Sequence, residues 1–142
     1  MHSAARIAKY EVDGVTHRSS SMFGRCTTCW SVREAGVSQE SVVIKDGWRN
    51  DDFSDEAEFL KIAGEANVPA VALLLLRDES FTALPVTIKS LRRRHGLPVD
   101  GIKDRVFTRI VLKHYGPSIR HFASGPQFLQ ILRDAIHGGF GV

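Results

Sequence analysis

Cysteines and long apolar runs are both scarce in this sequence, and each shortage excludes a class of protein. The 142 residues include two cysteines, too few for the disulfide framework of a small secreted domain. The longest apolar run, residues 68–76, contains Pro69 and has the length of a strand, which is too short to cross a membrane. The N-terminus lacks the apolar core of a signal peptide. We therefore expect an intracellular protein, cytoplasmic or nuclear, without a membrane segment.

The composition is that of an ordinary globular domain, with 43% hydrophobic and 25% charged residues. A chain of 142 residues corresponds to about one domain. The formal net charge of +3 is a mild excess that does not by itself indicate a nucleic-acid partner. The basic run at residues 89–95 contains no aromatic residue on which bases could stack. We interpret it as a solvated loop and do not expect a nucleic-acid partner.

Metal ligands are present only as incomplete patterns. Cys26 and Cys29 have the spacing of a zinc or redox pair, but a structural zinc site needs four ligands and no second pair follows. The six histidines are scattered, and none forms a ligand pair at helical spacing. We expect no metal site.

Residue patterning predicts a succession of strands and helices. A hairpin is expected between residues 24–32 and 37–44, a helix from Ser54 to about Ala66, a buried strand at 69–76, a strand at 106–112 and a helix opened by Ser124. The expected domain lies at residues 22–138, interrupted by a loop-rich basic insertion with one helical turn at 77–104. Residues 1–21 are expected to be weakly ordered, with a turn at 12–15, and residues 139–142 form a tail.

A lysine that ends a β-branched run and a glutamate near the start of the next helix are the strongest functional candidates. Side chains alternate between faces along a strand, so Val43 and Lys45 share a face. A lysine on an apolar face needs a partner. Glu56 supplies one, because helical spacing places it on one face with Leu60 and Ala63. The spacing predicts an ion pair between Lys45 and Glu56.

These pieces resemble the fungal-type protein kinase family, a divergent branch of the protein-kinase-like fold. The resemblance covers residues 22–138 and is carried by 24–27 with Trp30, 43–49, 56–60, 109–113 with Gly116, 122–124 and 133–136. Its most specific part is the Lys-Asp-x-Trp-Arg sequence at 45–49. It implies an α+β fold: the N-terminal lobe of a protein kinase, an antiparallel sheet of about five strands with an αC-type helix, followed by the first helices of the C-terminal lobe.

The resemblance also implies a nucleotide site. Lys45 would contact the α- and β-phosphates of ATP, held in place by Glu56, and Gly24 would belong to the loop that covers the phosphates. At the other end of the nucleotide, Val32 and Val43 would pack on adenine. Leu112 would lie beside the hinge, and the backbone from Lys113 to Tyr115 would form hydrogen bonds with the base.

The family activity is ATP-dependent phosphorylation of proteins by a serine/threonine kinase, a transferase. These 142 residues contain no His-Arg-Asp catalytic loop, hence no catalytic aspartate, and no Asp-Phe-Gly metal-binding motif. Cys26 and Cys29 stand where further glycines of the phosphate-covering loop are expected. The resemblance therefore implies a truncated, pseudokinase-like domain with little or no transferase activity, weak ATP binding at most, and Mg²⁺ only together with ATP.

Two other functions stay open at this point. The chain could be a non-catalytic interaction or scaffold module, because a truncated lobe exposes apolar surface that a protein partner would cover. A third reading, nucleic-acid binding through residues 92–94, predicts salt-dependent binding that neutral substitutions remove.

Overall fold

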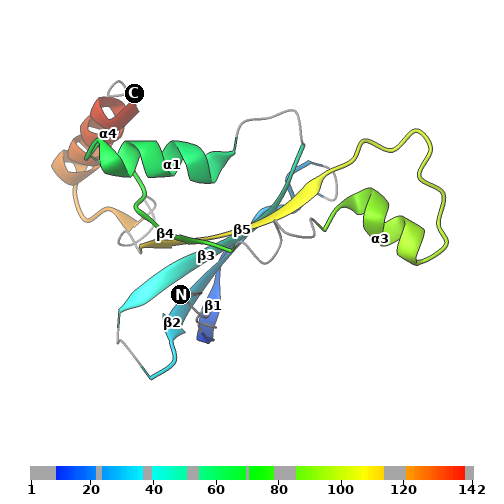
Figure 1. Ribbon diagram of the computed structural model, residues 1–142. Coiled ribbons are helices and arrows are strands. Elements are labelled where there is room, and N and C mark those ends of the chain that lie inside the picture. Colours follow the sequence, from blue (N-terminus) through cyan, green and yellow to red (C-terminus); the bar gives the residue numbers. More distant parts are fainter. Residues whose placement is uncertain are drawn as a thin grey trace, which may run out of the picture.

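The computed structural model describes residues 9–21, 24–36, 40–50, 55–69, 71–78, 86–113 and 121–139. Within these ranges the chain forms a five-stranded antiparallel sheet with three helices (Figure 1). The strands are β1 (Tyr10–Arg18), β2 (Thr28–Glu34), β3 (Ser41–Arg49), β4 (Leu74–Arg77) and β5 (Val106–Lys113), in the order β1-β2-β3-β5-β4. The helices are α1 (Glu56–Glu65), α3 (Ile88–Arg94) and α4 (Gly125–Gly139). The α+β class and the five-stranded antiparallel sheet are those that the sequence predicted.

The first strand occupies a segment for which we expected weak order and a turn. β1 pairs with β2 along its whole length, from Tyr10 opposite Glu34 to Arg18 opposite Thr28. The ladder is irregular on both sides of Gly14, between Val12 and Gly14 and again after Val15. Such bulges let turn-forming residues stay within a strand, so the expected turn at residues 12–15 is wrong.

The strand β5 lies inside the sheet, and β4 forms its edge. β5 pairs with β3 from Val106 opposite Arg49 to Lys113 opposite Val42. β4 has only four residues and pairs only with β5, with an irregularity between Leu74 and Leu76. The strand predicted at residues 69–76 is present only from Leu74, and its predicted burial is wrong, because a short edge strand has a neighbour on one side only. Three leucines of this segment are exposed: Leu73, Leu75 and Leu76.

The pairing register defines two faces of the sheet, because side chains of cross-strand partners lie on the same face. The α1 face carries Cys29, Ser31, Val43, Lys45, Ile110 and Leu112. The opposite face carries Trp30, Val32, Asp46, Arg109 and Val111. Helix α1 lies across the first of these faces (Figure 1). Both faces contribute to the small core, whose buried members among the described residues are Val32, Ala57, Ala63, Ile110 and Val111.

Helix α1 is fixed at its N-terminal end by Asp55. The Asp55 carboxylate accepts a hydrogen bond from the Ala57 N–H at 3.0 Å, the usual role of an N-cap side chain. The same carboxylate forms an ion pair with Arg77 of β4 at 2.6 Å. The sequence placed the cap at Ser54, which lies outside the described residues; the cap that the structure shows is Asp55.

The contact between α1 and the sheet uses small side chains. Ala57 and Ala63 are buried, whereas Phe59 and Ile62 are exposed. The apolar side chains of this helix therefore only partly face the sheet, and Phe59 and Ile62 are 55% and 49% exposed.

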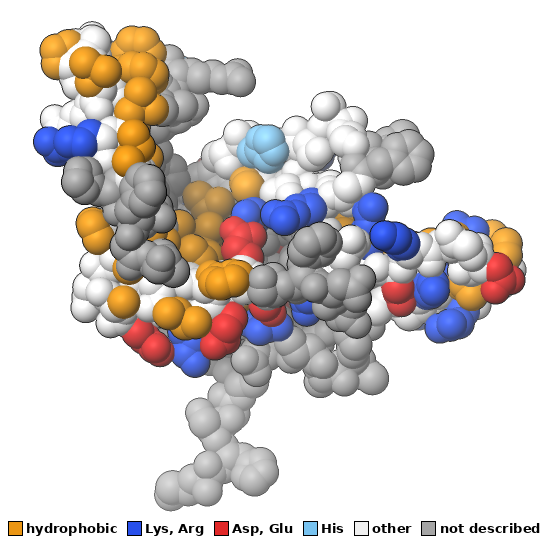
Figure 2. Space-filling model, turned by 90° about the horizontal axis from the view of Figure 1, so that it is seen from above, with side chains coloured by type: hydrophobic (Ala, Val, Ile, Leu, Met, Phe, Trp, Pro, Cys, Tyr) orange, Lys and Arg blue, Asp and Glu red, His pale blue; other side chains and the backbone are white. Residues whose placement is uncertain are grey.

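The insertion and the C-terminal helix lie at opposite ends of the molecule (Figure 1). Residues 88–94, expected as loop with one helical turn, form the seven-residue helix α3. The predicted start of α4 is confirmed by Ser124, whose hydroxyl accepts from the Gln127 N–H at 3.3 Å. Apolar side chains gather over α4 (Figure 2), where Leu129, Leu132 and Ile136 are exposed. Among the described residues, no helix combines the length and apolar character needed to cross a membrane.

Candidate functional site

Lys45 of β3 and Glu56 of α1 meet in the space between sheet and helix. The Lys45 Nζ donates to the Glu56 Oε1 at 2.5 Å, as the sequence predicted. Strand alternation directs the lysine to the α1 face, and the cap places the glutamate in the first helical position. The two side chains are 28% and 48% exposed, so the pair is open to solvent. Such a pair contributes about 0–1 kcal/mol to stability, and its ammonium group remains accessible to an anion.

A cavity of about 300 Å³ opens beside this pair. Its walls come from the loop before β2, the adjoining ends of β3 and β5, and the first turn of α1: Arg25, Thr27, Lys45, Gly47, Trp48, Arg49, Asn50, Asp55, Glu56, Phe59, Thr108 and Ile110. The volume is at the lower end of the range for small-molecule sites, about 300–1,000 Å³. The site therefore combines a positioned cation with room for a small anionic group.

Of the two residues predicted to pack on adenine, Val43 lies on the α1 face and Val32 does not, while Leu112, predicted beside the hinge, shares the face of Val43. Val43 and Leu112 are direct partners across β3 and β5. Val32 instead pairs with Val42, so it points to the opposite face, and its side chain is 0% exposed. The prediction that Val32 and Val43 line one surface is wrong, because a shift of one residue along a strand reverses the face. Ser31 pairs with Val43 and occupies that place on β2.

Gly24 lies in the loop between β1 and β2. Its φ of +104° belongs to the region that favours glycine. The Gly24 carbonyl accepts a hydrogen bond from the Arg105 guanidinium, and the Arg25 carbonyl accepts from the Trp48 N–H at 2.8 Å. Cys26, which stands in place of a glycine, has a φ of +45°. These hydrogen bonds join the loop to the sheet at the edge of the cavity. Cys26 is a residue of this loop that has a left-handed backbone conformation without being glycine.

The hinge expected after β5 is described only at its first residue. Lys113 ends β5, and its N–H donates to the Leu73 carbonyl at 2.9 Å. This N–H is therefore already bonded within the protein, and the hydrogen bonds expected from the backbone of residues 113–115 to the base stay a prediction. Tyr115 lies outside the described residues.

Cys29 is a site residue that sequence reasoning missed. It pairs with Lys45 across β2 and β3, so its half-buried thiol shares the α1 face. The pKa of this thiol is raised, chiefly by burial; the Lys45 charge opposes the shift, while Glu56 and Asp46 add to it. Only the register, which the sequence does not contain, shows that Cys29 and Lys45 are neighbours. Among the residues that the structure describes, no three His, Cys, Asp or Glu side chains gather as a metal site would require.

Asp46 organises the opposite face of the same strand. Its two carboxylate oxygens accept from the Arg109 Nε at 2.7 Å and the Arg109 Nη2 at 2.9 Å, and the Trp30 Nε1 donates to it at 3.2 Å. The Asp46 hydrogen bonds raise the pKa of the Arg109 guanidinium. The Trp48 and Phe107 rings pack edge to face with centroids 5.2 Å apart. The aspartate and tryptophan of the Lys-Asp-x-Trp-Arg sequence thus fasten β3, the strand that carries the lysine, to its neighbours.

A comparison with protein families agrees with this geometry. A family model described as fungal protein kinase matches residues 1–98, more than half of the chain. The chain belongs to the fungal protein kinase family. The matched region includes β1 to β4, α1 and α3, and with them both members of the Lys45–Glu56 pair. Searches among curated proteins and among solved structures returned no match. The match thus covers four of the five strands of the sheet, whereas β5 and α4 lie beyond it.

Proposed function

We propose that this member of the fungal protein kinase family binds ATP, as Mg-ATP, along the α1 face of its sheet. The observation that carries the proposal is the 2.5 Å ion pair between Lys45 and Glu56 beside a cavity of about 300 Å³. Protein kinases use such a pair to hold the lysine that contacts the ATP phosphates. Here the pair has the required elements, a strand lysine and an αC-type glutamate, and it is open to solvent.

The residues present fit a nucleotide in one orientation. Lys45 and the wall of the cavity provide the cationic end, which suits the phosphates. Val43 and Leu112, which are direct partners on the neighbouring strands β3 and β5, provide an apolar surface for the base. Glu56 orients the lysine and would repel phosphate if the lysine were absent. Bound Mg²⁺ would neutralise part of the phosphate charge.

We further propose that these 142 residues by themselves bind the nucleotide without transferring its phosphoryl group. They contain no His-Arg-Asp sequence to supply a proton-accepting aspartate and no Asp-Phe-Gly sequence to supply a metal ligand. A phosphotransfer signal from this polypeptide that a Lys45→Ala change abolishes would contradict the proposal.

Thermal unfolding with Mg-ATP tests the binding. At a ligand concentration about ten times Kd, binding stabilises the native state by about 1.4 kcal/mol, or about 4 °C in Tm for a chain of this size. We expect this shift in the wild type and in the matched control Lys61→Ala, whose exposed lysine lies on α1 outside the cavity. We expect no shift in Lys45→Ala. Equal shifts in Tm for the wild type and Lys45→Ala would show that Lys45 does not bind the nucleotide. No shift in either protein would show that the chain does not bind Mg-ATP.

Alkylation of Cys29 gives a second, independent readout of the same site. The variant Cys26→Ser leaves Cys29 as the single thiol. Because burial raises the Cys29 pKa, labelling should be slow at neutral pH and measurable at about pH 9, where more thiolate forms. Mg-ATP bound beside Lys45 should slow the labelling several-fold, and this protection should disappear when Lys45 is also replaced by alanine. Labelling that is indifferent to Mg-ATP would contradict the proposed location.

A second candidate function, a non-catalytic interaction module, is favoured by the apolar side chains that the chain leaves exposed. Phe59 and Ile62 on α1 and Leu129 and Ile136 on α4 are the largest examples. A stable complex with a protein partner, with no response to nucleotide in either assay above, would favour this function over ATP binding.

A further inference from the structure

The helix α3 and its two connections form a projection at one end of the molecule. Residues 86–105, here called the α3 projection, extend beyond the sheet (Figure 1), and basic side chains gather over them (Figure 2). The projection returns to the sheet where Phe107 N–H donates to the Val86 carbonyl at 2.8 Å and Thr87 bridges to Val106.

The α3 projection carries more positive charge than the chain as a whole. It contains six basic residues, Lys89, Arg92, Arg93, Arg94, Lys103 and Arg105, and two acidic residues, Asp100 and Asp104. Its formal charge is therefore +4, compared with +3 for the whole chain, so the remaining residues are close to neutral. The positive field of the molecule is concentrated on this one projection.

Three of these basic side chains are exposed and form no hydrogen bond or ion pair with the described residues. Arg92 donates to the Pro98 carbonyl at 2.7 Å, and Arg105 donates to the Gly24 carbonyl. Arg93, Arg94 and Lys103 are exposed, and within the described part of the chain no hydrogen bond or ion pair is made by their side chains. They are available to an anionic ligand.

Asp104, one of the two acidic residues of the α3 projection, is engaged in hydrogen bonds to backbone groups. Asp104 Oδ1 accepts from the Lys89 N–H at 2.8 Å and from the Arg105 N–H at 3.0 Å. Desolvation alone would raise the Asp104 pKa, but these backbone bonds, with a bond from the Thr87 side chain, bring the pKa below its ordinary value. The Asp104 carboxylate thus accepts hydrogen bonds at the start of α3 and forms none with the arginine side chains of the helix.

The helix that presents the arginines is held at both ends. Thr87 and Ser90 form a capping box at its start, with Ser90 N–H to Thr87 Oγ1 at 3.0 Å. At its end Gly96, with φ +67°, donates to the Arg93 carbonyl, and the Leu97 N–H donates to the Arg92 carbonyl at 2.9 Å. This pair of bonds is a Schellman motif, which fixes the chain leaving a helix. The side chains are therefore presented from a rigid element, which lowers the entropy cost of binding.

We propose that the α3 projection binds a short acidic segment of a partner protein, with Arg93, Arg94 and Lys103 pairing its carboxylates. Leu97, which is 49% exposed and fixed by the Schellman motif, provides an apolar contact beside the charges. A surface that combines arginine with an exposed leucine suits a protein ligand. Residues 86–105 contain no Phe, Tyr or Trp for stacking on bases, and the near-neutral remainder of the chain would not hold a long polyanion.

Fluorescence anisotropy with a labelled peptide, in which aspartate and glutamate flank a central leucine, tests the proposal. The triple change Arg93→Gln, Arg94→Gln, Lys103→Gln should weaken binding about tenfold, since each exposed charge pair contributes a factor of about two to three. The matched control Lys9→Gln, Arg18→Gln, Lys61→Gln removes three exposed cations elsewhere and should change binding by less than about twofold. A second variant, Arg93→Glu with Arg94→Glu, should bind more weakly than the triple neutral variant, with circular dichroism confirming that both remain folded.

Three results would overturn the proposal. The first is no binding of the peptide by the wild type. The second is equal weakening by the triple change and by its control, which would indicate attraction by net charge alone. The third is duplex DNA or single-stranded RNA binding at least as tightly as the peptide and with the same sensitivity to the triple change, which would assign the projection to nucleic acid.

Discussion

Lys45 and Asp46 are neighbours in β3, and strand geometry sends their charged groups to opposite faces of the sheet. The lysine reaches Glu56 in an open site, whereas the aspartate is 14% exposed and joins three side-chain hydrogen bonds. Substitutions of the two residues should therefore change the free energy of unfolding by different amounts. The lysine serves the site, and the aspartate holds the strand that presents it.

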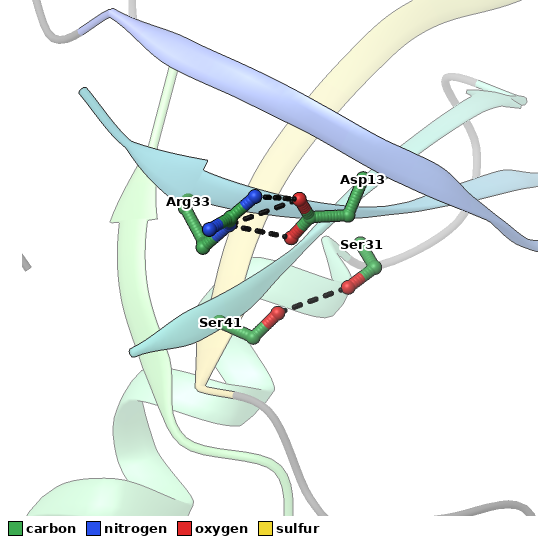
Figure 3. A network of polar contacts seen from close by, with 4 residues as sticks. All are labelled: Asp13, Ser31, Arg33 and Ser41. Carbon is green, nitrogen blue, oxygen red and sulfur yellow. Dashed lines mark hydrogen bonds and ion pairs between the residues drawn. The ribbon is translucent and has the colours of Figure 1, made fainter. Parts of the chain in front are cut away.

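Replacing Asp46 by alanine should destabilise the protein by about 2–3 kcal/mol, because it removes charge-assisted bonds and leaves the Arg109 guanidinium without its partner. Urea denaturation followed by fluorescence measures the change in unfolding free energy. The control is Asp13→Ala, which removes an exposed pair with Arg33 at 2.6 Å (Figure 3) and should cost about 0–1 kcal/mol. Similar costs for the two changes would contradict a structural role specific to Asp46.

The residues of the site were predictable to different degrees. Strand alternation and helical spacing are local rules, and they were enough to bring Lys45 and Glu56 together. The positions of Val32 and Cys29 depend on which residue of β2 lies opposite each residue of β3. That register is set by a contact between two strands, so a single-strand pattern could not distinguish Val32 from Ser31. Ser31 itself is further fixed across the hairpin by a 3.0 Å hydroxyl contact with Ser41 (Figure 3).

At the scale of elements, α3 shows how a seven-residue helix persists outside a core. Its first three N–H groups all have acceptors: Ile88 N–H donates to the Arg105 carbonyl, Lys89 N–H to Asp104 and Ser90 N–H to Thr87. Satisfied ends offset the poor intrinsic stability of so short a helix. The sequence showed mainly the basic run here, and the acceptors come from residues up to seventeen positions away.

The attachment of α3 should depend on pH through Asp104. Because the folded-state pKa of Asp104 is lowered, its contribution is fully present above the unfolded value of about 3.9 and is lost as pH falls through the lower folded pKa. The amide chemical shifts of Lys89 and Arg105 should therefore titrate together below about pH 3.9, and Asp104→Asn should abolish that titration. A midpoint above the ordinary aspartate value would show that the backbone bonds do not favour the carboxylate.

The edge strand β4 has a strongly hydrophobic sequence pattern but is not buried as that pattern predicted. A run of leucines predicted a buried strand, but β4 pairs on one side only. Hydrophobicity indicates that a segment benefits from burial, yet the position of a strand within a sheet depends on the topology of the whole chain. Leu75 and Leu76 consequently remain exposed.

At the scale of the whole molecule, charge and apolar surface occupy opposite ends. The basic α3 projection lies at one end and the apolar side chains of α4 at the other (Figure 2). Exposed apolar side chains that cluster on one element favour association. Composition could not reveal this separation, because it depends on where the sheet places the two helices.

We expect the chain to associate as its concentration rises, through α4. Sedimentation velocity should show an average mass that increases above the 15.8 kDa of the chain. Leu129→Ser with Ile136→Ser, which removes two side chains that are 66% and 58% exposed, should return the mass toward that value. The matched control Val12→Ser with Val15→Ser removes two exposed apolar side chains of β1 and should leave the association intact. A monomer at every concentration, or equal effects of the two pairs of changes, would contradict the role of α4.

The double attachment of Asp55, to the first turn of α1 and to Arg77, joins the start of this helix to the edge strand β4. Glu56 is the next residue, so its position opposite Lys45 depends on a contact with a strand that carries neither of them. A change at Arg77 should therefore be felt at Lys45, although Arg77 does not touch it.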